Sequence, residues 1–242
     1  MAVSDALMRG ALERIGPTTI PIAQVGGIRG TAFLFNELLT RAPQQETVRT
    51  FLVTCRLLIE NQQFLTVEVP PYRTSPPGVA SREIVLHGLD GMWRVGDGGV
   101  AIGYFAHLEE HAASKGWAWD MTEVTDGIAI RADELDALDA VSCLVFGFAG
   151  EQAGREEIVF EAPLVRNAAG WEIPTAVPAG LVGGPVAIFK RNGEGQVVLK
   201  CLGLVLPGNE RHPIATFDVI RALIASQARP SRRRRWPGPR RK

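Results

Sequence analysis

The sequence has no apolar run of roughly 18 or more residues, which excludes a membrane-spanning helix by the usual length criterion. The first 16 residues show no basic segment followed by an apolar stretch and a small-residue cleavage site, so we expect a mature, cytoplasmic protein. Glycine-rich turns occur, but none carries the lysine of a phosphate-binding loop. We therefore expect no nucleotide site of that type and no cofactor.

Cysteine is scarce, with only three residues in the chain. Cys55, Cys143 and Cys201 all lie inside apolar segments. An odd number of cysteines in apolar strands is typical of reduced core thiols and not of a disulfide framework.

The net charge is zero, but the charges are unevenly distributed. Residues 229–242 hold eight of the 26 basic residues and no acidic one. Such a block repels itself and contains three prolines, so we predict a disordered basic tail. The tail is a candidate site for nonspecific nucleic acid or an anionic surface, or else it only offsets the acidic body. The binding candidates are Arg232, Arg233, Arg234, Arg235, Arg240, Arg241 and Lys242.

Short strands dominate the rest of the chain. Hydrophobic residues make up 46% of the full sequence, which also contains 26 glycines and 16 prolines, as is typical of strands joined by turns. Ten β-branched and aromatic segments favour a barrel or sandwich over a parallel α/β fold. These expected strands are residues 18–25, 30–35, 47–55, 64–70, 82–88, 99–105, 142–148, 156–162, 184–190 and 196–206.

Apolar periodicity predicts helices in three places. The first covers residues 4–15 and ends at Gly16-Pro17, so residues 1–16 are expected to form an N-terminal helical segment. The second covers 105–116, between two halves rich in strands, and the third covers 217–228.

Segments in several parts of the chain resemble motifs of the trypsin-like serine proteases. "GTAFLF" at 30–35 and "FLVTCRLLIE" at 51–60 are similar to "GTGFLV" and "LVTNRHVV" of intracellular bacterial members. In this alignment Thr54 and Arg56 match, and Leu57 stands where the catalytic histidine belongs.

A second segment, "MWRVGDGGVAIGYF", resembles the strand that carries the catalytic aspartate in the same family. Gly99 stands at the aspartate position, and Asp97 is two residues out of register. The loop "AGLVGGPVAIF" resembles the one that presents the nucleophile, with Val182 at the serine position. Weaker similarities at 144–150 and 162–171 lie between these segments, in the family's order.

The resemblance spans residues 17–228 and implies an all-β fold. That fold consists of two six-stranded antiparallel β-barrels of trypsin-like type, with a short N-terminal helix and a C-terminal helix. The expected halves are residues 17–105 and 118–208, followed by a helix at 214–228. A chance similarity in turns and strands, or another β-barrel family, is the alternative.

The triad needs a hydroxyl, an imidazole and a carboxylate, and the aligned side chains supply none of them. The resemblance therefore implies a pseudoprotease that binds a peptide or protein partner in the former substrate cleft. The backbone N–H groups of Gly180 and Val182 stand where the family builds its oxyanion hole. Two states of the cleft are open alternatives: it is filled by Leu57 and Val182, or it is free to bind.

Two other functions are considered. One is an active hydrolase whose site is misaligned here. It would use His87, with Asp97 as its carboxylate, or the H-x-x-E-H zinc-binding pattern in "HLEEH". In that motif His107 and His111 share a helix face with Glu110 beside them, but a solvated linker helix explains the same pattern. The last alternative is a β domain, unrelated to proteases, that presents the basic tail to a polyanion.

Overall fold

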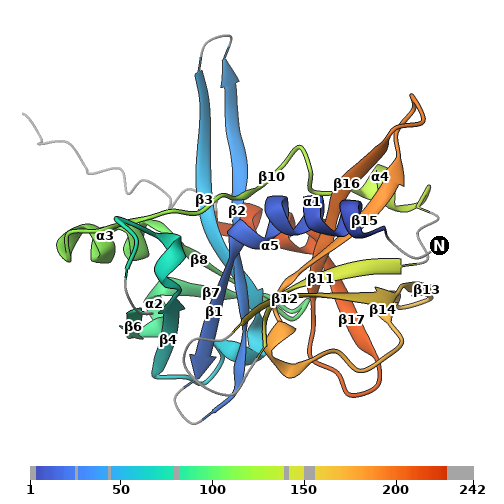
Figure 1. Cartoon of the computed structure of the whole chain (residues 1–242). Coiled ribbons are helices and arrows are strands. Elements are labelled where there is room, and N and C mark those ends of the chain that lie inside the picture. The colour runs from blue at the N-terminus through green and yellow to red at the C-terminus, as the bar shows by residue number, and fades with distance from the viewer. Residues whose placement is uncertain are drawn as a thin grey trace, which may run out of the picture.

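Two curled antiparallel sheets form the body of the protein (Figure 1). The computed structural model describes residues 4–24, 27–42, 45–78, 82–138, 142–149 and 156–227. The basic tail at 229–242 lies outside these described residues. Among the described residues, no helix is both long enough and apolar enough to cross a membrane.

The first sheet has eight strands within the described chain, in the order β6-β4-β1-β2-β3-β8-β7, with the short β10 pairing parallel to β2. Its strands are β1 (Thr19–Gln24), β2 (Arg29–Ala42), β3 (Gln45–Cys55), β4 (Phe64–Val69), β6 (Arg82–His87), β7 (Trp93–Val95), β8 (Val100–Tyr104) and β10 (Val124–Thr125).

The second sheet has seven strands in the described part of the chain, in the order β12-β11-β15-β16-β17-β14-β13. They are β11 (Ser142–Ala149), β12 (Glu156–Pro163), β13 (Val165–Asn167), β14 (Gly170–Ile173), β15 (Pro185–Arg191), β16 (Val197–Val205) and β17 (His212–Thr216). A separate pair joins β5 (Thr74–Ser75) to β9 (Ala118–Trp119).

The expected all-β architecture with a helix near each end is confirmed. All ten expected segments form strands, and short strands that the sequence did not indicate raise the number in each sheet above six. The short strands β9 and β10, at 118–125, pair with β5 and with β2 of the first sheet, so the second sheet begins only at β11.

Nine helical segments occur in the described chain. The α-helices are α1 (Asp5–Ile15), α2 (Leu89–Met92), α3 (Ala106–Ser114), α4 (Ala132–Leu135) and α5 (Phe217–Gln227). The 3₁₀ turns are η1 (Gly16–Thr18), η2 (Arg56–Leu58), η3 (Pro71–Arg73) and η4 (Ala179–Leu181).

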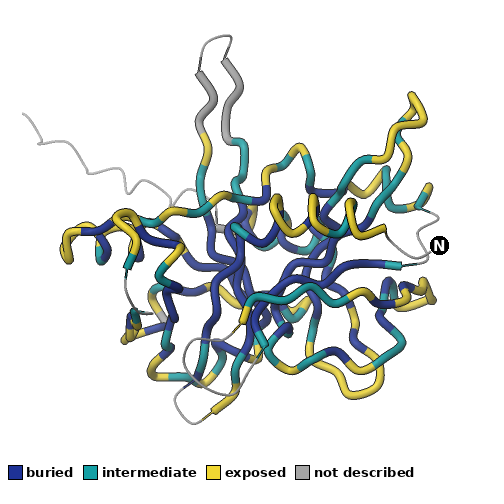
Figure 2. Tube along the Cα trace, in the orientation of Figure 1, coloured by how far each residue is buried: buried dark blue, intermediate teal, exposed yellow. Residues whose placement is uncertain are grey.

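Each terminal helix packs against the sheet at the other end of the chain. Ala11 and Ile15 of α1 are buried with Leu144 and Phe146 of β11 in the second sheet. Phe217 of α5 packs among first-sheet aromatics, with its ring centroid 5.0 Å from that of Phe35 and 6.2 Å from that of Phe33. The helices therefore hold the two halves together, and the most deeply buried chain lies where the sheets meet (Figure 2).

A buried ion pair also joins the halves. The Nη2 of Arg73 on η3 donates to both carboxylate oxygens of Glu157 on β12, at 3.0 and 2.9 Å. Both side chains are largely buried. Burial raises the pKa of Glu157, while Arg73 acts in the opposite direction. This contact fixes β12 relative to the first half.

Candidate functional site

The loop that contains Val182 is held against the first sheet by Thr31 of β2. The Thr31 N–H donates to the carbonyl of Val182 at 2.9 Å, and its hydroxyl donates to the carbonyl of Gly180 at 2.7 Å. The same hydroxyl accepts the N–H of Phe148 on β11 at 3.2 Å. One threonine therefore connects the first sheet, the second sheet and the loop.

Glycine is needed in this loop because the two halves approach closely. Gly183 has φ +86°, and a Cβ there would lie 2.5 Å from both the carbonyl of Thr31 and the hydroxyl of Thr54. Only a residue without a side chain fits that conformation and that space. The "GLVGGP" pattern therefore arises from backbone packing at the seam between the sheets.

The backbone at Val182 is already hydrogen-bonded in this conformation. Residues 179–181 form the 3₁₀ turn η4, and the Val182 N–H donates to the carbonyl of Ala179 at 3.3 Å. The sequence-based proposal that the Gly180 and Val182 N–H groups form a hole for an oxyanion therefore requires this bond to break.

Leu57 lies on the opposite side of the cleft, in the turn η2 that follows β3. Its carbonyl accepts a 2.6 Å hydrogen bond from Nε2 of Gln24, which holds the turn against β1. Beside it, Arg56 pairs with Glu60 one helical turn later. The Leu57 side chain is 46% exposed, a large value for leucine.

Gly99 stands immediately behind this turn. Its carbonyl accepts the N–H of Arg56 at 2.7 Å, so it is one peptide away from Leu57. It has φ +76°, and a Cβ there would lie 3.1 Å from the Leu206 side chain. The nearby Asp97 is exposed.

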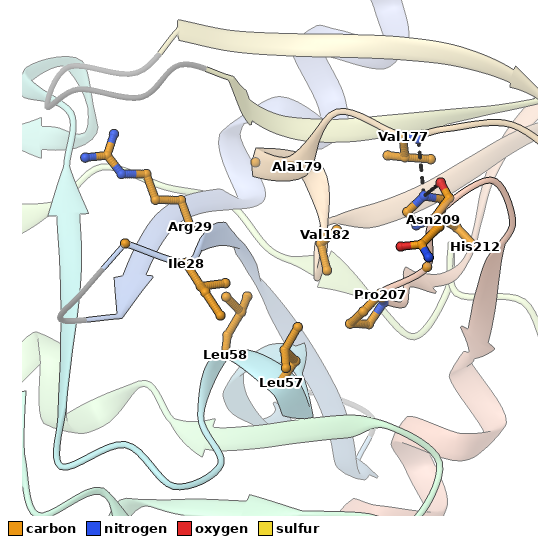
Figure 3. Close-up of a pocket in the computed structure, with 13 residues that line it drawn as sticks. Ile28, Arg29, Leu57, Leu58, Val177, Ala179, Val182, Pro207, Asn209 and His212 are labelled. Carbon is orange, nitrogen blue, oxygen red and sulfur yellow. Dashed lines mark hydrogen bonds between the residues drawn. The ribbon is translucent and has the colours of Figure 1, made fainter.

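A cleft of about 670 Å³ brings these positions together (Figure 3). Leu57, Val182 and Gly180 all line it, and Gly99 is bonded to the residue that precedes Leu57. Of the two alternatives from the sequence, the structure has the open cleft. Its lining residues are Gly27, Ile28, Arg29, Leu57, Leu58, Val177, Ala179, Gly180, Val182, Pro207, Gly208, Asn209 and His212.

Sequence reasoning missed His212, which lines one end of the cleft and is 2% exposed. Its Nδ1 lies 3.1 Å from the carbonyl of Leu206. Its Nε2 accepts the N–H of Val177 at 3.3 Å and lies 3.1 Å from the carbonyl of Asn209. Both ring nitrogens face backbone groups, so the imidazole stabilises the backbone at this end of the cleft and does not offer a free base to a ligand.

Sequence reasoning also missed Arg29, which lines the opposite end of the cleft in Figure 3. Neither residue belongs to a motif that could have indicated it, because each reaches the cleft through strand pairing.

Cys55 is the thiol closest in sequence to Leu57, and its environment makes it unreactive. Burial raises the pKa of the Cys55 thiol to about 11. The group is therefore protonated near neutral pH, and a thiol is far less nucleophilic than a thiolate.

The other sequence candidates do not line the cleft. His87 lies on the edge strand β6, where its ring packs edge-on against Phe64 at 4.9 Å. His107, Glu110 and His111 lie on α3, and the first two are exposed. In the described part of the chain, no group of three or more His, Cys, Asp or Glu side chains could hold a metal ion. The arginines of the tail lie outside the described residues.

The chain is similar in structure to several solved proteins. Deg5 is 12% identical, with 91% of this chain and 94% of Deg5 covered and a TM-score of 0.50. The MamO protease domain from Magnetospirillum magneticum is 11% identical, covering 86% of this chain and 96% of that domain, with a TM-score of 0.49. The serine endoprotease from Yersinia pestis is 9% identical, covering 93% of this chain and 67% of that protein, with a TM-score of 0.49.

No protein-family model matches the sequence, and no curated protein does so either. At 12% identity, the likeness to Deg5 bears on the fold alone. With its two curled antiparallel sheets and its terminal helices, the chain has the fold of the trypsin-like serine proteases.

Proposed function

We propose that the chain is a catalytically inactive homologue of the trypsin-like serine proteases that binds a peptide segment without cutting it. The observation that carries the proposal is the position of Leu57 and Val182. Both line one open cleft, with Gly99 directly behind Leu57. These are the positions that the sequence alignment assigns to the histidine, serine and aspartate.

The side chains in the cleft support a role without covalent chemistry. A nucleophile needs a base within hydrogen-bond reach, and the base needs a group to orient it. Valine has no nucleophilic atom, leucine accepts no proton, and glycine orients nothing. The single imidazole among the described lining residues, that of His212, faces backbone groups.

The shape of the cleft supports binding. Ligand pockets usually have volumes of about 300–1,000 Å³ and apolar walls with a few polar groups. The cleft has about 670 Å³, and its apolar residues Ile28 and Leu57 are each 46% exposed. Exposed apolar side chains grouped in a concave site are typical of a surface that a partner covers.

Two measurements test the proposal. The purified chain should not react with a fluorophosphonate probe and should not cut a mixed peptide library, since it lacks the nucleophile and base. Addition of a peptide aldehyde should shift the amide resonances of Gly180 and Val182. Peptide cleavage at a rate proportional to the concentration of the purified chain would contradict inactivity, also if the L57W variant cleaves equally well. A lack of any shift at these amides would contradict the binding site.

The tail supports a second candidate function, binding of a polyanion. Eight basic residues within 229–242 provide charge without any sequence readout. Removing residues 229–242 should weaken binding to DNA or anionic vesicles at low salt. Unchanged affinity of the shortened chain would refute this function and leave the cleft proposal intact.

A further inference from the structure

The cleft carries one formal charge among its described lining residues, that of Arg29. The remaining residues are apolar or glycine, apart from Asn209 and His212. Figure 3 places Arg29 at one end of the cleft, and Asn209 and His212 at the other. Between these ends the walls are formed by Ile28, Leu57, Leu58 and Val182.

The guanidinium of Arg29 forms no ion pair with a described residue. Its Nη1 is buried and has no hydrogen-bond partner there. The other arginines that form ion pairs meet a carboxylate within the chain: Arg56, Arg73, Arg131, Arg166, Arg211 and Arg221.

Arg29 is partly exposed and lines the cleft, and a carboxylate is the partner that best complements its positive charge. Arginine presents its N–H groups in a planar fork that matches the two oxygens of a carboxylate. The position therefore favours a ligand that brings a negative charge into this end of the cleft.

The neighbours of Arg29 define the rest of the ligand. Ile28 precedes it in the chain, and Leu57 faces the same cleft from η2. Both are 46% exposed, so an apolar ligand group placed between them would remove apolar surface from contact with water, which is favourable. The combination is an apolar contact next to an anionic contact.

We propose that the cleft selects a peptide in which an aspartate or glutamate side chain meets Arg29 while an adjacent apolar side chain packs on Ile28 and Leu57. This selectivity rests on the proposed function, because it assumes that the cleft binds a peptide. Arg29 is the residue that determines specificity, and Leu57 supplies apolar area.

The test uses the full chain and a library of N-acetylated, C-amidated hexapeptides, so that the only carboxylates are side chains. The best-binding peptides should contain Asp or Glu beside an apolar residue. Replacing that acid by Asn or Gln should weaken binding by about tenfold to a hundredfold, as expected for a charge-assisted hydrogen bond. R29Q should cause a loss of the same size, and R29K should retain part of the affinity.

R94Q is the matched control, since Arg94 is exposed on β7 and does not line the cleft. It should bind as the wild type does. L57W fills the cleft from an exposed position and should abolish binding of every library peptide. Circular dichroism of each variant checks that the fold is kept.

The outcomes separate the two proposals. If L57W abolishes binding but R29Q and the Asp-to-Asn peptides have no effect, the acidic selectivity is wrong and peptide binding stands. If neither L57W nor R29Q alters binding, or if no peptide binds, both proposals are wrong. A matched set of the same hexapeptides with a free C-terminal carboxylate is tested alongside; if only this set binds, selection of an acidic side chain is overturned and peptide binding stands.

Discussion

The hydroxyl of Thr31 donates a 2.7 Å hydrogen bond to the carbonyl of Gly180, 149 residues further along the chain. The same oxygen accepts the N–H of Phe148, and the Thr31 N–H is bonded to Val182. A single side chain of the first sheet therefore sets the position of the loop that forms one wall of the cleft. The shape of the cleft depends on this seam between the sheets.

Replacing Thr31 by valine should destabilise the protein by about 1–3 kcal/mol, because it leaves the Gly180 carbonyl and the Phe148 N–H without their side-chain partner. T31S keeps the hydroxyl and loses one methyl group, so it should cost about 1 kcal/mol or less. Urea unfolding of both variants measures the difference. A loss for T31V no larger than that for T31S would contradict the role assigned to the hydroxyl.

Glu134 should make the protein sensitive to acid. Burial raises the pKa of its carboxyl, but hydrogen bonds from Lys190, the Arg131 N–H and Lys200 outweigh that effect and lower the pKa to about 2. The folded state thus favours the ionised form, and this stability is present above pH 4.5 and is lost as the pH falls toward 2. Glu134 and its lysine partners are partly exposed, so solvent screening keeps this contribution to roughly 1 kcal/mol.

E134Q should therefore be less stable than the wild type at pH 7 and nearly equal to it at pH 2, as measured by urea unfolding across this range. E194Q is the control, since Glu194 is exposed and forms no salt bridge with a described residue. An E134Q deficit that stays constant from pH 7 to pH 2 would contradict the assignment.

The three cysteines should be inert in the folded protein. Cys55, Cys143 and Cys201 are all free and buried, and burial raises their thiol pKa values to about 11, 12 and 12. A thiol reagent such as DTNB at pH 8 should find almost no thiolate in the native state. In denaturant it should titrate three thiols. Rapid labelling of a native thiol would show that one of them is accessible.

Gly99 should resist substitution for a backbone reason. It has φ +76°, and a Cβ there would lie 3.1 Å from Leu206. G99A should cost about 1–2 kcal/mol from the left-handed conformation. G193A is the control, because no atom lies within 4 Å of the added Cβ and no positive φ is required. A thermal unfolding midpoint of G99A equal to that of G193A would contradict this reading of the turn.

V182S alone should not create a serine nucleophile. The new hydroxyl would face Leu57 across the cleft, and leucine cannot take up its proton. The variant should remain unlabelled by a fluorophosphonate probe under conditions that label a trypsin standard completely. Stoichiometric labelling of V182S would mean that another base serves this position, and the proposed inactivity would then rest on Val182 alone.

The strands and the terminal helices were predictable from local pattern. All ten segments rich in β-branched and aromatic residues are strands, and α1 and α5 lie where apolar periodicity places them. Short strands such as β14 and β17 were missed. These strands are too short to show a clear alternation of apolar and polar residues. They are strands because adjacent strands of the second sheet pair with them.

The candidate site was predictable only where a motif existed. Leu57, Gly99 and Val182 came from alignment with the family's motifs; the structure brings Leu57 and Val182 to one cleft and places Gly99 behind Leu57. The opposite ends of that cleft, Arg29 and His212, belong to no motif. A residue's charge is visible in a sequence, but whether that charge has a partner depends on which distant segments fold beside it.

The sequence by itself determined the all-β character, the helices at both ends and the absence of a hydroxyl, imidazole and carboxylate at the three aligned positions. Those properties depend on local periodicity and on residue identity. Only the tertiary structure decided that α1 covers the second sheet and α5 the first, that Thr31 holds the Gly180 loop, and that Arg29 lines the cleft without an ion pair to any described residue. These are contacts between residues far apart in the chain, and the burial of apolar surface and the pairing of polar groups select them only when the whole chain folds.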